Sequence, residues 1–214
     1  ILEDLVHYAI DRHYPNLKGV KNPAQGLLKA VIEKQAELIT NWMRVGFIHG
    51  VMNTDNMTIS GETIDYGPCA FMDTYNPETV FSSIDHHGRY AYGNQPAIAH
   101  WNLLRFTETL LPLIHDKQDK AIKIAEETIN NFNAVYKKHW LDMMRKKLGL
   151  FREENGDKTL IADLLSWMQQ NKADYTNTFC SLLKKDVLKN KLFQDSAFLN
   201  WHQRWQTRLT QNKE

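Results

Sequence analysis

The sequence predicts a mainly α-helical protein in which one long irregular stretch carries the chemistry. Apolar residues recur near every 3.6 positions through most of the chain, as on the buried face of a helix. The exception is a segment of about fifty residues between positions 46 and 96, which is rich in Gly, Pro, Asn and Asp. Long ordered stretches without helical periodicity are usually functional. We therefore expect a helical scaffold that displays a site built from loops.

The composition is typical of one or two globular domains. The chain has 214 residues and 43% hydrophobic content, enough to bury a sizeable core. The formal net charge of +1 creates no overall field toward nucleic acid or an anionic membrane, and the longest apolar run is far too short to span a bilayer. Cys69 and Cys180 are isolated, as expected in a reducing compartment. We expect a cytoplasmic protein with no nucleic-acid or membrane partner.

The clearest helix lies in the first quarter of the chain. Asn22 is a good capping residue, Pro23 is pre-set for the first helical turn, and Gly46 suits a helix end. Apolar residues at helical spacing lie between them, so a long amphipathic helix is predicted over 23–45. The same periodicity predicts helices at 2–12, 97–114, 117–148, 160–169, 175–190 and 197–211.

A short β-hairpin is predicted inside the irregular stretch. The segments 57–60 and 63–66 alternate in polarity on either side of Gly61, which begins a Gly-Glu pair suited to a two-residue turn. Such a turn places Ile59 opposite Ile64. The face that carries these two isoleucines should anchor the hairpin to the core.

The opposite face of this hairpin predicts a metal site. Asn56 and Asp65 would be diagonal neighbours there, with side chains able to converge on one cation. An amide oxygen and a carboxylate suit Mg²⁺, which usually takes its other ligands from water and substrate phosphates. The pair therefore indicates a nucleotide-binding metal site.

The same stretch has the two ends of a kinase catalytic loop. His49 and Asn56 are spaced as in H-R-D-x-x-x-x-N, and Asp65-Tyr66-Gly67 stands where a kinase has the metal-binding Asp-Phe-Gly. Val51 occupies the position of the catalytic Asp and cannot accept a proton. Asp55 is the nearest replacement base, with a helix cap or turn as its alternative role. We expect His49 to orient the loop by bonding to backbone rather than to bind phosphate.

Together these motifs resemble the selenoprotein O family. The resemblance covers at least residues 46–114. It is carried by Gly50-Val51-Met52-Asn53-Thr54-Asp55-Asn56-Met57, Ile64-Asp65-Tyr66-Gly67-Pro68, Asp85-His86-His87-Gly88-Arg89-Tyr90 and Gln95-Pro96-Ala97.

This resemblance implies a kinase-like protein adenylyltransferase, which transfers AMP from ATP to Ser, Thr or Tyr hydroxyls of proteins. It implies Asp55 as the proton acceptor, Asn56 and Asp65 as ligands of Mg²⁺ or Mn²⁺, and Asp65 against the ATP phosphates as well. The expected fold is then a mainly α, protein-kinase-like C-terminal lobe with a short β-hairpin at 1–116, followed by a helical extension at 117–214.

The sequence also departs from the family. It has no G-x-G-x-x-G loop and no V-A-I-K lysine, so we expect a C-lobe fragment that lacks the ATP-gripping lobe and is inactive alone. Cys180 is not expected to be the family's C-terminal cysteine or selenocysteine. Asp85-His86-His87 is expected to serve structurally or on the substrate side rather than to bind zinc. An atypical kinase that transfers the γ-phosphoryl group and a non-catalytic pseudokinase scaffold remain as alternatives.

Overall fold

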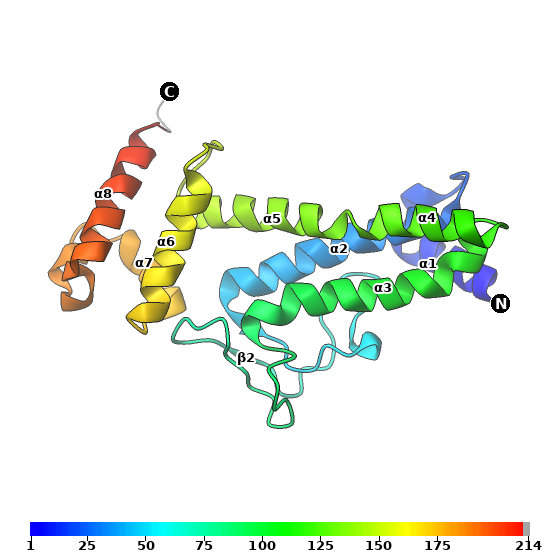
Figure 1. Ribbon diagram of the computed structural model, residues 1–214, viewed down its shortest axis with the longest axis horizontal. Coiled ribbons are helices and arrows are strands. Elements are labelled where there is room, and N and C mark those ends of the chain that lie inside the picture. Colours follow the sequence, from blue (N-terminus) through cyan, green and yellow to red (C-terminus); the bar gives the residue numbers. More distant parts are fainter. Residues whose placement is uncertain (212–214) are drawn as a thin grey trace.

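The computed structural model describes residues 1–211, which form mainly helices around one irregular stretch (Figure 1). The helices are α1 (Leu2–His13), α2 (Pro23–Val45), α3 (Gln95–Ile114), α4 (Gln118–Ile129), α5 (Phe132–Lys147), α6 (Asp157–Gln170), α7 (Tyr175–Leu182) and α8 (Ser196–Thr210). The mainly α prediction is confirmed. None of these helices is both long and apolar enough to cross a membrane.

Helix α2 is the central scaffold, and the predicted bounds of 23–45 are confirmed. The side chain of Asn22 accepts a hydrogen bond from the Gln25 backbone N–H, so it caps the first turn as expected. Gly46 ends the helix in the left-handed conformation, with φ of 71°. The apolar side of α2 packs against α3, α4 and α5, which run alongside it in the long body of the molecule (Figure 1).

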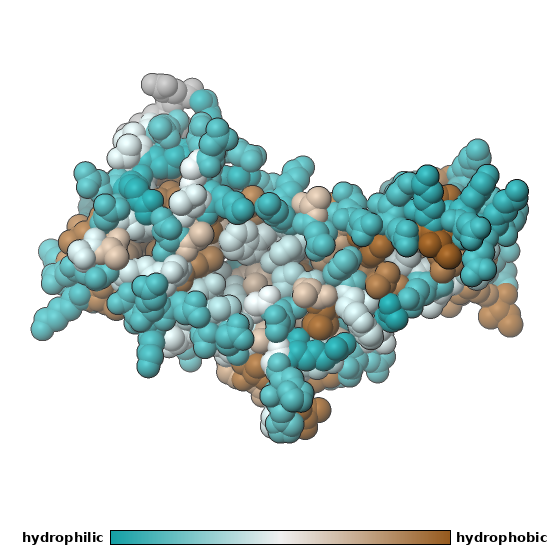
Figure 2. Space-filling view, viewed as in Figure 1, coloured by the Kyte–Doolittle hydropathy of each residue, from teal (hydrophilic) through white to brown (hydrophobic). Residues whose placement is uncertain are grey.

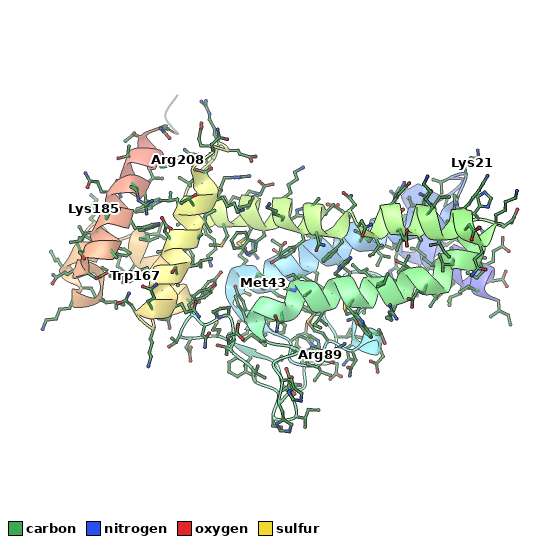
Figure 3. All side chains as sticks on the ribbon, viewed as in Figure 1. Lys21, Met43, Arg89, Trp167, Lys185 and Arg208 are labelled. Atoms are coloured by element: carbon green, nitrogen blue, oxygen red, sulfur yellow. The ribbon has the colours of Figure 1, made fainter. Side chains whose placement is uncertain are left out.

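Helices α6, α7 and α8 lie together at the end of the molecule away from the N-terminus (Figure 1). Tryptophans tie this end together: the indole N–H of Trp201 donates to the Leu160 carbonyl, and that of Trp205 donates to the Leu148 carbonyl. Arg208 and Asp157 form a buried ion pair at 2.7 Å, which joins α8 to the start of α6 (Figure 3). The buried side chains of these helices are continuous with the core around α2.

Two helix predictions in the second half were too long. The predicted helix at 117–148 is broken after Ile129, where Asn130 and Asn131 separate α4 from α5. Asparagine competes for backbone hydrogen bonds and is a poor interior helix former, which fits a break at this pair. The predicted helix at 175–190 stops at Leu182, and the next residue, Leu183, is largely exposed.

The irregular stretch contains a small antiparallel sheet that the sequence did not predict. Strand β1 (Phe47–Ile48) pairs with β2 (Ala70–Phe71), with Phe47 opposite Phe71. This pairing closes the segment between them into one loop, which holds all the predicted site residues. Exposed apolar side chains gather over this stretch and at the α1 end (Figure 2).

The hairpin predicted around Gly61 is wrong. In place of a ladder between 57–60 and 63–66, the structure has a single bridge between Met57 and Thr63, so the register is shifted. Ile64, predicted to anchor the hairpin, is 40% exposed, whereas Ile59 does pack against the core.

The physical reason lies at Thr58. Its carbonyl, which the predicted ladder would use, accepts instead from the side-chain amide of Gln35 on α2 at 2.6 Å. Its hydroxyl accepts from the Glu62 N–H and donates to the Glu62 carbonyl. The Thr58 carbonyl also accepts from the Gly61 N–H at 3.3 Å, so these bonds close a compact loop at 58–62 in place of the predicted strand ladder.

Candidate functional site

His49 is the centre of the candidate site. It is completely buried, and its ring stacks on that of Trp42 with centroids 5.2 Å apart. The ring Nε2 lies 2.7 Å from the Ile64 carbonyl, and because a carbonyl only accepts, Nε2 carries the proton. Nδ1 then accepts from the Val51 N–H at 3.3 Å. The prediction that His49 orients the loop through backbone groups is confirmed.

Asn56 is the last residue of a 3₁₀ turn, Thr54–Asn56, which comes shortly after His49 in the chain. Its side-chain NH₂ donates to the Val51 carbonyl at 2.9 Å, which fixes the orientation of the amide. The amide oxygen, the atom that a metal would take, has no hydrogen-bond partner within residues 1–211. The side chain is therefore held in place while its metal-binding atom stays available.

Asp65 comes directly after Ile64, whose carbonyl accepts the hydrogen bond of His49. It is one of two non-glycine residues within 1–211 with a positive φ, at 55°, a conformation that costs an L-residue on the order of 1 kcal/mol. Its side chain is exposed, and its carboxylate has neither a hydrogen bond nor an ion pair within the described part of the chain. Such local strain, at a free carboxylate, is common at functional sites.

Asp55 lies in the same 3₁₀ turn as Asn56 and is exposed. Its carboxylate makes no capping hydrogen bond among the residues that the structure describes, so the alternative capping role has no support there. It keeps a free carboxylate beside Asn56.

The predicted site residues are joined through His49 rather than through hairpin pairing. One series of bonds runs from the Asn56 amide to Val51, from Val51 to the His49 ring, and from that ring to Ile64, next to Asp65. This series fixes the segment of Asn56 relative to the segment of Asp65. The prediction that Asn56 and Asp65 are diagonal neighbours depended on a hairpin register that the structure does not have.

The donor set fits a hard cation of the magnesium type. Asn56 and Asp65 each offer an oxygen that no described residue uses. Residues 1–211 contain no group of three or more His, Cys, Asp or Glu side chains that could enclose a metal. A cation held here would take most of its ligands from water and phosphate, as Mg²⁺ does at nucleotide sites.

Sequence reasoning missed two buried amides that support the loop. Gln95 accepts from the His49 N–H and donates to the Phe47 carbonyl, both at 3.0 Å. Asn102 donates to the Met52 carbonyl at 2.9 Å. Both face the core from α3, seven residues apart on one side of the helix. Polar residues at that spacing on an apolar face were the signal available in the sequence.

A second loop supports the site from the outside. Asp85 accepts from the backbone N–H groups of Arg89 and Tyr90 at 2.9 and 2.8 Å, which shapes the 85–90 turn. The Tyr90 hydroxyl then donates to the Asn53 side chain at 2.6 Å. Asp85 thus has a structural role, one of the two that the sequence allowed.

Comparisons with known proteins agree with these motifs. The family model described as "Protein adenylyltransferase SelO" matches residues 1–214. Proteins named protein nucleotidyltransferase YdiU are similar: that of Alcanivorax borkumensis is 56% identical over 214 residues, all of this chain and 44% of that protein. That of Pelagibacter ubique is 57% identical over 208 residues, or 97% of this chain and 43% of that protein. The chain thus spans less than half the length of these relatives.

Proposed function

The chain belongs to the SelO family, and we therefore propose that the full-length protein transfers AMP from ATP to Ser, Thr or Tyr hydroxyls of other proteins. The observation that carries the proposal is the His49-centred series of hydrogen bonds. It holds Asn56 and Asp65 in adjoining segments while their oxygen atoms stay free for a cation and its nucleotide.

Each candidate residue has a distinct part in the proposed reaction. Asn56 and Asp65 would hold Mg²⁺, or Mn²⁺ in its place, and Asp65 would also lie against the ATP phosphates. The cation, when bound, supplies positive charge that neutralises the phosphates. Asp55 would accept the proton of the attacking hydroxyl. The hydroxyl oxygen bonds to the α-phosphorus, the bond to pyrophosphate breaks, and the product is a phosphodiester-linked AMP.

The proposed fold assignment follows from the same family. Residues 1–116 would be the C-terminal lobe of a kinase-like fold, and residues 117–214 a helical extension, of which 212–214 lie outside the described residues. The sequence has no glycine-rich G-x-G-x-x-G loop, so the remaining ATP contacts would come from other parts of the full-length protein, and these 214 residues alone would be inactive. The two isolated cysteines support a cytoplasmic location.

A double-label experiment tests this function. The full-length protein is incubated with Mg²⁺, a generic protein acceptor and ATP labelled at either the α- or the γ-phosphate. We expect label transfer from the α-phosphate only, and its loss in Asp65→Ala. Asp119→Ala, which removes another exposed carboxylate on α4, is the matched control and should stay active. Transfer from the γ-phosphate would indicate a kinase, and transfer from neither would favour a scaffold.

A further inference from the structure

Arg89 lies next to the candidate site, in the turn at residues 85–90 (Figure 3). Its backbone N–H donates to the Asp85 carboxylate, and the next residue, Tyr90, donates its hydroxyl to the Asn53 side chain at 2.6 Å. Asn53 is the N-cap residue of the 3₁₀ turn that contains Asp55. Two side-chain contacts therefore connect Arg89 to the turn that carries the proposed proton acceptor.

The side chain of Arg89 is stacked on an aromatic ring but has no counter-ion. Its guanidinium carbon lies 4.9 Å from the centre of the Trp101 ring, near the start of α3. Within residues 1–211 the guanidinium makes neither a hydrogen bond nor an ion pair. Stacking uses only the flat face of a guanidinium and leaves the N–H donors at its edge free. The exposed Arg89 side chain is thus oriented by Trp101 while its donors stay available.

The other charged groups of this surface already have partners. Arg105 also lies over the Trp101 ring, at 5.2 Å, but it forms an ion pair with Glu108 at 2.8 Å. Asp85 uses its two carboxylate oxygens on two backbone N–H groups of its own turn. Arg89 is therefore the charged group of this cluster that lacks a partner among the described residues.

We propose that Arg89 binds an acidic side chain of the protein substrate, close to the hydroxyl that receives AMP. This inference rests on the proposed function and adds a substrate class to it: hydroxyls that have Asp or Glu nearby in the chain. A carboxylate matches the planar donor fork of a guanidinium, and stacking has already restricted the side chain. Because only Tyr90 and Asn53 separate Arg89 from the turn of Asp55, we expect the acidic residue within about four positions of the acceptor, a reach of about 13 Å.

Two acceptor peptides test the proposal with the full-length protein and α-labelled ATP. Both contain one acceptor hydroxyl; one peptide has Glu two to four positions away on each side, and the other has Gln at the same positions. We expect kcat/KM to be about fivefold higher for the Glu peptide, the size of an exposed ion pair, and the two to become equal in about 0.5 M NaCl. Equal kcat/KM at low salt would overturn the proposal.

Variants of Arg89 test the location of the contact. Arg89→Gln should remove the preference, and Arg89→Glu should invert it in favour of a peptide with Lys at the same positions. Arg44→Gln is the matched control, since Arg44 is another exposed arginine without an ion pair among the described residues, and it should keep the preference. A preference that persists in Arg89→Gln would overturn the proposal. So would a KM for ATP that rises equally with both peptides, because it would assign Arg89 to the nucleotide.

A binding measurement separates this inference from the proposed function. Peptide binding to the full-length protein without ATP is followed by ligand-observed NMR, which does not depend on transfer. Tighter binding of the Glu peptide, lost in Arg89→Gln, would support the contact even if neither peptide receives label, a result that would contradict the proposed function alone. Equal binding of the Glu and Gln peptides would overturn the inference and leave the proposed function standing.

Discussion

Replacement of His49 by leucine tests the central role of this residue. Leucine keeps apolar bulk in a fully buried position but removes both ring hydrogen bonds, those to the Ile64 carbonyl and from the Val51 N–H. Each group that loses its partner in a buried place costs about 1–3 kcal/mol. We expect the free energy of unfolding to fall by about 2–4 kcal/mol.

The larger effect should be on the proposed transfer activity. Without the ring, the segment of Asp65 is no longer fixed relative to Asn56, and a displacement of about 1 Å at a reacting centre can cost on the order of 100-fold in rate. Thermal and denaturant unfolding of the full-length protein measure stability, and α-labelled ATP measures transfer.

A matched control is available on the surface. His139 bonds to Glu33 at 2.6 Å, but both side chains are substantially exposed, so His139→Leu should change stability by at most about 1 kcal/mol and leave transfer unchanged. The reasoning would be refuted if His49→Leu were as stable and as active as His139→Leu. A stable but inactive variant would still support the positioning role.

Three further predictions concern stability and pH. Asp157→Asn removes the negative charge of the buried ion pair with Arg208 and should lower the free energy of unfolding in denaturant by about 3–5 kcal/mol. Arg204→Met, at the exposed pair with Asp163, should lower it by at most about 1 kcal/mol. Burial raises the pKa of Tyr14 from its ordinary value of 10 to about 12. The stability contributed by the neutral hydroxyl is therefore complete below pH 10 and is lost as the pH rises toward 12. Tyr14→Phe should flatten the dependence of the urea midpoint on pH in that window. Asn22→Ala should cost about 1 kcal/mol, measured by thermal unfolding, because it removes the α2 cap.

The helical part of the fold was predictable because its signals are local. The bounds of α2 follow from the capping side chain of Asn22 and the left-handed conformation of Gly46, both of which depend on neighbours within a few residues. The hairpin was not predictable in the same way. The Thr58 carbonyl accepts from Gln35, which is 23 positions earlier in the chain, and this contact depends on how α2 packs against the loop. The bonds of Thr58 to Gly61 and Glu62 are local, but the alternating polarity around Gly61 did not reveal them.

In the candidate site, too, the local motifs were predictable and the long-range contacts were not. The motif spacing identified Asp55, Asn56 and Asp65 as candidates and gave His49 its orienting role, but the way in which these segments meet depends on tertiary contacts. The expected diagonal pairing came from an assumed hairpin register, and the structure replaces it with hydrogen bonds through the buried ring of His49.

Three amides from the scaffold helices hold this loop: Gln35, Gln95 and Asn102 each donate to a loop or strand carbonyl. They differ in their oxygens. That of Gln95 accepts from the His49 N–H, so its hydrogen bonding is satisfied within the core. Those of Gln35 and Asn102 have no hydrogen-bond partner among the described residues. Gln35 and Asn102 therefore hold the loop through their N–H donors alone, whereas Gln95 holds it through both ends of its amide, one on Phe47 and the other on His49. Because Gln95 bonds directly to the residue that fixes the segments of Asn56 and Asp65, it is the scaffold amide most closely coupled to the candidate site.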